Sequence, residues 1–139
     1  MSVYSMLIVD DEKKVFSALE RELAEEGYVL YFASSGEEAL AGLADHPCQV
    51  IISDIKMPGM DGLTLLQKVR ELYPGMIRIV LSGHADIKLI LESVNRYGID
   101  RYLTKPWDPD DLKLTIRQGL ELFELKQELA ALRQKAGRP

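Results

Sequence analysis

The sequence of 139 residues contains a single cysteine, Cys48, so it cannot form a disulfide bond within the chain. Cys48 stands beside an apolar stretch and is expected to be a small packing residue. No apolar run approaches the ~18 residues that a membrane span needs. The first residues carry neither the basic nor the apolar segment of a secretory signal. We therefore expect a cytoplasmic protein that makes no contact with a membrane.

The chain also lacks an excess of positive charge, because 17 lysines and arginines stand against 22 aspartates and glutamates, a formal net charge of -5. This balance gives no electrostatic footprint for nucleic acid, and no polybasic patch for a membrane surface. Direct binding of nucleic acid is not expected. Hydrophobic residues make up 47% of the chain, which suits a single compact domain that buries roughly two-thirds of the surface of its unfolded chain.

Short apolar, β-branched runs alternate along the chain with segments whose apolar residues recur every three or four positions. The first pattern is typical of strands buried on both faces, and the second of amphipathic helices. Strands are expected at residues 6–9, 28–33, 48–53, 77–81 and 100–104, and helices at residues 13–26, 37–44, 63–72, 87–97 and 108–135. Five strands alternating with five helices through short connections predict a doubly wound α/β fold with a parallel sheet.

Asp54 stands where the third predicted strand ends, and a turn rich in proline and glycine follows it at residues 57–62. In open α/β sheets, ligands bind at the carboxyl ends of the strands. An acid at this edge is therefore a better candidate for chemistry than an acid on a helix face. Taken alone, the stretch favours the interpretation of Asp54 as a solvated loop aspartate, and only the other motifs of the chain change that interpretation.

The connections after strands one, three, four and five carry Asp10 and Asp11, Asp54, Ser82 and Lys105, respectively. In a parallel sheet these connections lie on one edge, where each close pair of carboxylates would repel by ~4 kcal/mol at an effective dielectric constant near 20. A divalent cation with oxygen ligands, together with a lysine, would neutralise this charge. The constellation suits phosphoryl transfer to a carboxylate nucleophile, with the lysine and the serine hydroxyl bound to phosphate oxygens.

With these motifs in order, the chain resembles the receiver domain of two-component response regulators over residues 4–123. No single motif is specific, but all of them occur at the spacings that the family uses. The matching residues are the metal-binding acid pair Asp10 and Asp11, the phosphoacceptor Asp54, the MPxMDG loop at 57–62, the switch residues Ser82 and Tyr102, and the dipeptide Lys105-Pro106.

The resemblance implies a flavodoxin-like sheet with strand order 2-1-3-4-5 and a cis peptide bond before Pro106. It also implies Mg²⁺ bound by Asp11, Asp54 and the backbone carbonyl of Lys56, with Asp10 acting through water. His84 occupies a position that flanks the phosphoryl group in receivers. It is interpreted either as a residue that affects phosphate lifetime or as a solvated loop residue.

In function, the resemblance implies a phosphorylation-activated signalling switch rather than an enzyme. The domain would take a phosphoryl group from the phosphohistidine of a sensor histidine kinase or a phosphotransfer protein onto Asp54. It would catalyse its own phosphorylation and dephosphorylation, with Asp54, Ser82 and Lys105 as the reacting and binding groups. Phosphorylation would then change the surface of the fourth helix, fifth strand and fifth helix, which controls a partner or an output module.

Two alternatives come from other protein classes. A phosphatase of the haloacid dehalogenase type also uses a strand-end aspartate as its nucleophile, but it requires a second acid two residues later, where this chain has Lys56. A nucleotide-binding domain would need a glycine-rich loop after the first strand. Residues 10–13 contain no glycine there. Both alternatives therefore rank below the receiver interpretation.

The segment 124–139 is expected to be a helical extension of the domain. Its apolar stripe begins just before it, with leucines 122, 125, 129 and 132 at spacings of three and four. This spacing favours helix pairing, so the extension is predicted to form a parallel coiled coil in a homodimer or to lead to a covalently linked output domain. Two heptads are short for a coiled coil, and the alternative is a tail that frays or folds back.

Overall fold

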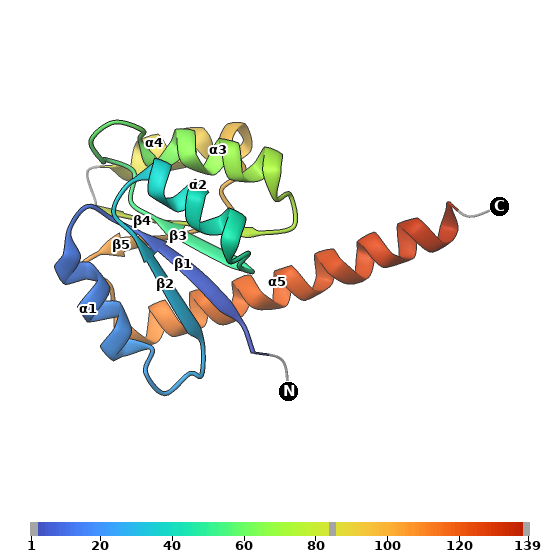
Figure 1. The fold of residues 1–139 in the computed structure, drawn as a ribbon, viewed down its shortest axis with the longest axis horizontal. Helices are drawn as coiled ribbons and strands as arrows, with labels where there is room; N and C mark the ends of the chain where they lie inside the picture. The colour runs from blue at the N-terminus through green and yellow to red at the C-terminus, as the bar shows by residue number, and fades with distance from the viewer. Residues whose placement is uncertain (1–2, 84–85, 138–139) are drawn as a thin grey trace.

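The computed structural model describes residues 3–83 and 86–137 and shows five parallel strands in the order β2-β1-β3-β4-β5 (Figure 1). This is the predicted α/β fold and strand order. The strands are β1 (Ser5–Val9), β2 (Val29–Ala33), β3 (Val50–Ser53), β4 (Ile77–Gly83) and β5 (Arg101–Lys105). The helices are α1 (Lys13–Glu22), α2 (Gly36–Asp45), α3 (Gly62–Leu72), α4 (Ile87–Tyr97) and α5 (Pro109–Ala136).

Helices cover both faces of the sheet, with α2, α3 and α4 on one side and α1 and α5 on the other (Figure 1). The central strands supply both cores, because alternate side chains of a strand point to opposite faces. In β1, Leu7 and Val9 belong to the core under α2, α3 and α4, while Met6 and Ile8 belong to the core under α1 and α5. The near-continuous apolar runs of β1, β3 and β4 therefore follow from burial on both faces.

The predicted end of the first helix is wrong. Residues 13–26 were expected to be helical, but α1 ends at Glu22, with Leu23 as its C-cap, and Gly27 then adopts a positive φ of 79°. Leu23 is buried and extends the apolar spacing by one turn, so the pattern alone conceals the end of the helix. Beyond Leu23 no apolar residue continues the stripe, and the chain tightens into turns such as the hydrogen bond from Glu26 N to Leu23 O.

Helices α2, α3 and α5 each begin at a residue whose side chain accepts a hydrogen bond from a backbone N–H three residues later. The pairs are Ser35 with Glu38 N (3.1 Å), Asp61 with Thr64 N (2.7 Å) and Asp108 with Asp111 N (3.4 Å). Helix α4 differs, because its N-cap residue Asp86 makes no such hydrogen bond to the described residues. The carboxylate of Asp86 is instead directed towards the carboxyl edge of the sheet.

Helix α5 has 28 residues and projects beyond the sheet (Figure 1), which confirms the long helix predicted for this segment. Its extension remains attached near residue 124, where the Tyr4 hydroxyl donates to Glu124 Oε1 at 2.6 Å. Lys126 Nζ lies 3.4 Å from Asp100 Oδ1, and Asp100 also pairs with the buried Arg78. Among the described residues, no helix combines the length and apolar character needed to cross a bilayer.

Candidate functional site

Four of the predicted site residues come together at the carboxyl edge of the sheet. Asp10 follows β1 and Asp54 follows β3, while Ser82 is the second-last residue of β4 and Lys105 is the last residue of β5. The backbone ladder continues past the strands and fixes both acids, since Asp54 N donates to Val9 O at 3.0 Å and Asp10 N donates to Ala33 O at 3.1 Å. The parallel topology therefore converts distant sequence positions into one cluster.

Lys105 links the two buried acids of this cluster. Its Nζ lies 2.6 Å from Asp10 Oδ2 and 3.1 Å from Asp54 Oδ2. Burial by itself would lower the pKa of Lys105, but the hydrogen bond and attraction to Asp10, supported by Asp54, outweigh burial and raise this pKa. Lys105 is therefore positively charged at neutral pH. Burial also raises the pKa of Asp10, whose side chain is 1% exposed, against the opposing pull of Lys105 and the Glu12 N–H.

The carboxylates of Asp10, Asp11 and Asp54 form a candidate cation site. One oxygen from each residue lies within 4.8 Å of the other two, and Asp11 is exposed while Asp10 and Asp54 are buried. Hard oxygen donors of this kind suit Mg²⁺ or Ca²⁺. A single lysine cannot neutralise three carboxylates, so the charge of the cluster also favours a cation. The residues present therefore fit the divalent metal that the sequence implies.

Ser82 contacts an acid that the sequence analysis did not assign to the site. Its hydroxyl is 3.3 Å from Asp54 Oδ1 but only 2.7 Å from Oδ2 of Asp86, which is buried. The other Asp86 oxygen is 3.2 Å from Lys56 Nζ, on a largely exposed side chain. The hydrogen bond from Ser82 lowers the pKa of Asp86, and Lys56 adds to this effect against the smaller influence of burial. The signal in the sequence was an acid four residues after the switch serine.

Tyr102, another predicted residue, lies outside this cluster. Tyr102 is 42% exposed and lines a surface pocket with Val94 and Arg101, so its side chain is partly accessible to solvent. The interpretation of His84 concerns a position outside the described residues. The predicted cis peptide bond is present between Lys105 and Pro106.

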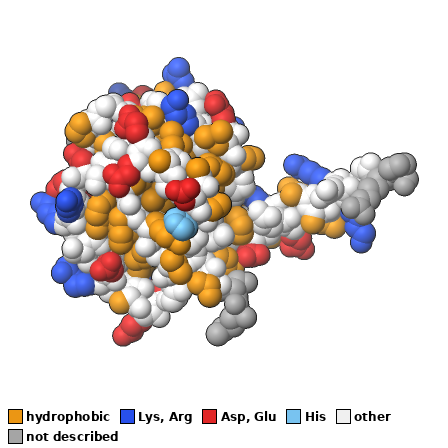
Figure 2. Space-filling model, in the orientation of Figure 1, with side chains coloured by type: hydrophobic (Ala, Val, Ile, Leu, Met, Phe, Trp, Pro, Cys, Tyr) orange, Lys and Arg blue, Asp and Glu red, His pale blue; other side chains and the backbone are white. Residues whose placement is uncertain are grey.

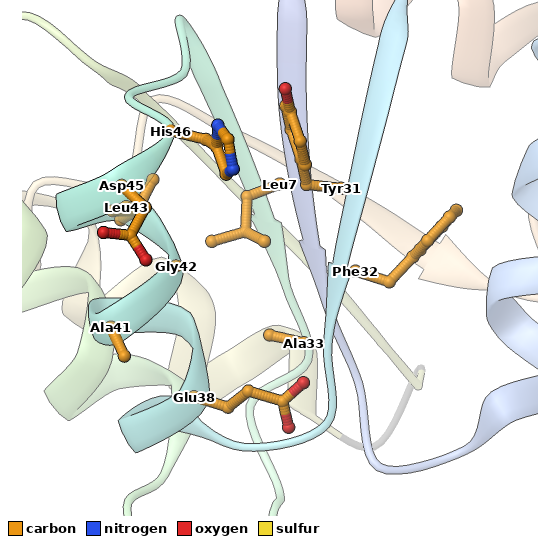
Figure 3. A pocket seen from close by; sticks show the side chains of 10 residues that line it. All are labelled: Leu7, Tyr31, Phe32, Ala33, Glu38, Ala41, Gly42, Leu43, Asp45 and His46. Carbon is orange, nitrogen blue, oxygen red and sulfur yellow. The ribbon is translucent and has the colours of Figure 1, made fainter.

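A separate cavity of about 320 Å³ lies between β2 and α2 (Figure 3). The rings of Tyr31 and His46 stack there with centroids 4.9 Å apart. Glu38 lies near its other end (Figure 3). The lining contains none of the predicted site residues. The candidate site is thus an open cluster at the sheet edge rather than this cavity.

Comparison with known proteins agrees with this geometry. The family model of the response regulator receiver domain matches residues 6–117. The chain is 44% identical over 128 residues to the hydrogenase transcriptional regulatory protein HoxA of Cupriavidus necator, which covers 92% of this chain and 26% of HoxA. It is 33% identical to the DNA-binding transcriptional regulator NtrC of Salmonella typhimurium, covering 87% of this chain and 26% of NtrC. The chain thus spans about a quarter of the length of these curated relatives.

Solved structures show the same relationship. The signal receiver domain of an HD domain-containing protein from Pseudomonas fluorescens Pf-5 superposes with a TM-score of 0.86 at 37% identity, covering 92% of this chain and 95% of that one. NtrX from Brucella abortus superposes with a TM-score of 0.88 at 29% identity, covering 99% of this chain and 31% of NtrX. A family model over most of the chain, the shared fold and the cluster at the sheet edge lead to one conclusion: the chain belongs to the response regulator receiver domain family, whose members are phosphorylation-activated switches.

Proposed function

We propose that Asp54 accepts the phosphoryl group, and that the donor is the phosphohistidine of a sensor histidine kinase or a phosphotransfer protein. The observation that carries this proposal is the buried strand-end carboxylate of Asp54, 3.1 Å from Lys105 Nζ and clustered with two further acids. A carboxylate oxygen of Asp54 attacks phosphorus, an O–P bond forms, and the P–N bond of the donor breaks. The electron pair of that bond returns to the donor imidazole, which takes up a proton from solvent.

The groups that serve this transfer come from the domain itself. Lys105 can bind one phosphoryl oxygen, since its Nζ already lies beside Asp54, and the Ser82 hydroxyl can donate to another. Asp11, Asp54 and the backbone carbonyl of Lys56 would hold Mg²⁺, with Asp10 acting through water. When bound, Mg²⁺ neutralises charge on the transferring group. Because these groups belong to one chain, we expect the domain to catalyse its own phosphorylation and dephosphorylation.

The phosphatase alternative receives no support from the site. A haloacid dehalogenase phosphatase would place an acid at position 56, where the ammonium of Lys56 pairs with Asp86. The receiver family model, in contrast, spans the whole cluster.

In the switch that we propose, the Ser82 hydroxyl moves towards the phosphoryl group and Tyr102 turns inward from its exposed position. The α4–β5–α5 surface then changes and controls a partner or a linked output module. The greater length of the HoxA and NtrC relatives supports a linked module. Phosphorylation need only favour one of two pre-existing states by a few kcal/mol.

Incubation with acetyl phosphate and Mg²⁺ tests the proposed function. We expect mass spectrometry to show one added phosphoryl group per chain, and none when EDTA removes the metal. Continuous release of inorganic phosphate, with no labelled protein at any time, would instead indicate a phosphatase. If the protein were not labelled and no inorganic phosphate were released, the proposal would be contradicted.

Replacing Asp11 with alanine is expected to weaken Mg²⁺ binding by at least about tenfold, because the site loses one of its charged oxygen ligands. Asp11 is exposed, so the fold should tolerate the change. Isothermal titration with MgCl₂ measures the affinity, and Asp45→Ala, which removes an exposed acid outside the cluster, is the matched control. Equal affinities of the Asp11→Ala and Asp45→Ala proteins would remove Asp11 from the site.

We propose that the extension of α5 pairs with its equivalent in a second copy as a parallel coiled coil. Leu125, Leu129 and Leu132 are exposed by 61%, 47% and 58%, so the domain leaves the stripe uncovered. Acidic and basic side chains lie beside hydrophobic ones on this projecting end (Figure 2), as at the flanks of paired helices. The contacts of Glu124 and Lys126 with the domain fix the base of the extension. This proposal also divides the chain into a receiver domain at residues 4–123 and a helical extension at residues 124–139.

We expect the double variant Leu129→Glu, Leu132→Glu to be monomeric under conditions in which the wild-type chain dimerises, because four like charges would enter the paired stripe. Sedimentation at tens of micromolar, with and without beryllofluoride, measures the state. Gln134→Glu, which adds an acid without removing a leucine, is the control and should still dimerise. A wild-type chain that is monomeric in both states, or a dimer that survives deletion of the residues after Phe123, would rule out the coiled coil.

A further inference from the structure

The Ser82 hydroxyl has two carboxylate neighbours and a single hydrogen to donate. Asp86 Oδ2, at 2.7 Å, is closer than Asp54 Oδ1, at 3.3 Å. Ser82 and Asp86 are both buried, with 1% and 8% of their surface exposed, respectively. A short hydrogen bond to an ionised and buried acceptor is stronger than a neutral one. In the unphosphorylated protein, the Ser82 hydroxyl therefore donates its hydrogen bond to Asp86, and this bond keeps the hydroxyl away from the phosphorylation site.

Asp86 is also the N-cap residue of α4, and it leaves this role unfilled. Aspartate is among the preferred N-cap residues because its carboxylate accepts hydrogen bonds from the first free N–H groups of a helix. Asp61 and Asp108 do this for α3 and α5. Asp86 has helical φ and ψ angles of -95° and -2° rather than the extended values of those two, and it makes no capping bond to the described residues. Its carboxylate thus serves Ser82 instead of α4.

We propose that Asp86 is a positioning residue with two alternative partners: the Ser82 hydroxyl before phosphorylation, and the first turn of α4 after it. This inference rests on the proposed phosphorylation of Asp54. When the phosphoryl group takes the hydroxyl, Asp86 loses its partner and becomes free to cap α4. The exchange connects the phosphorylation site to α4 by two hydrogen bonds, without a change in packing.

Lys56 completes this arrangement. It belongs to the β3–α3 connection, and its ammonium lies 3.2 Å from Asp86 Oδ1. Because the Lys56 side chain is 74% exposed, the ion pair is weak. It therefore orients the Asp86 carboxylate without preventing its movement towards α4.

Two substitutions separate the two roles. Asp86→Ser removes the charge and the second oxygen that reach Ser82, but serine is as good an N-cap as aspartate. We expect its affinity for beryllofluoride, in the presence of Mg²⁺, to rise about tenfold, because the unphosphorylated state loses a charge-assisted hydrogen bond. Asp86→Ala loses both roles, so its affinity should rise by a smaller factor. Glu92→Ser removes an exposed acid from α4 and should leave the affinity unchanged.

Amide hydrogen exchange gives a second readout that does not depend on affinity. Beryllofluoride should slow exchange at Lys88 and Leu89, in the first turn of α4, in the wild type and in Asp86→Ser but not in Asp86→Ala. If Asp86→Ser bound beryllofluoride no more tightly than the wild type, the proposal that Asp86 keeps the Ser82 hydroxyl away from the phosphorylation site would be overturned. The capping role would be overturned if Asp86→Ala bound beryllofluoride as tightly as Asp86→Ser or more tightly. It would also be overturned if amide exchange at Lys88 and Leu89 were equal in all three proteins. A wild-type chain that fails to bind beryllofluoride would instead refute the phosphorylation of Asp54.

Discussion

The Asp54→Asn protein is expected to take up less than about 1% of the phosphoryl groups that the wild type accepts, because an amide is a poor nucleophile and forms no acyl phosphate. The site around it should survive. The backbone N–H of Ile55 donates to Asp54 Oδ1 at 2.7 Å, and an amide oxygen can accept the same bond. The new NH₂ group would face Lys105 Nζ, which keeps its shorter contact with Asp10. Intact-mass measurement after incubation with acetyl phosphate and Mg²⁺ gives the result.

The control for this loss is Asp45→Asn, which makes the same chemical change at an exposed position outside the cluster and should be labelled like the wild type. Equal thermal midpoints of the two variants would show that the loss is chemical. If Asp54→Asn were fully labelled, and peptide mapping placed the phosphoryl group on another residue, the assignment of Asp54 would be wrong.

The fold could be predicted from the sequence because its strands are short apolar runs and its helices have one apolar face. Burial of β1 and β3 on both faces makes their apolar runs nearly continuous, and that pattern leaves little ambiguity. The end of α1 could not be found in this way. Leu23 keeps the helical spacing although it is already the C-cap, and the following turn is held by tertiary contacts such as the ion pair of Glu26 with Arg117.

The site was predictable as far as it depends on strand ends. Asp10, Asp54, Ser82 and Lys105 meet because parallel strands place their carboxyl ends together. The contact of Asp86 with Ser82 could not be predicted from the sequence. The Asp86 carboxylate could accept a hydrogen bond either from an N–H group of α4 or from the Ser82 hydroxyl, and only the structure shows that it accepts from Ser82.

Buried Arg78 gives a similar example at the other edge of the sheet. Its partners are the carbonyls of Gly98 and Met76 and the carboxylate of Asp100, and Asp100 in turn binds Lys126. Spacing along the chain contains no trace of these contacts.

Gly62→Ala is expected to destabilise the domain by about 3 kcal/mol, because overpacking against backbone cannot be relieved by a rotamer change. Gly62 is the first residue of α3, and its N–H donates to Ile55 O at 2.7 Å. A Cβ at this position would overlap the backbone carbonyl oxygen of Asp54 and press on Ile55 Cα. Its φ is not positive, so the requirement for glycine is close approach rather than backbone conformation. Urea denaturation measures the free energy of unfolding.

Gly42→Ala is the matched control, since a Cβ there meets nothing within 4 Å. Gly42 lies inside α2, where alanine has the higher helix propensity, so this variant should gain about 0.5–1 kcal/mol. The two substitutions are chemically identical and should move stability in opposite directions.

The Gly62→Ala chain that remains folded should also be phosphorylated more slowly, because relief of the overlap displaces the backbone that carries Asp54. Wild-type stability and labelling of Gly62→Ala would show that the α3 N-terminus can retreat from β3 and that Gly62 does not position Asp54.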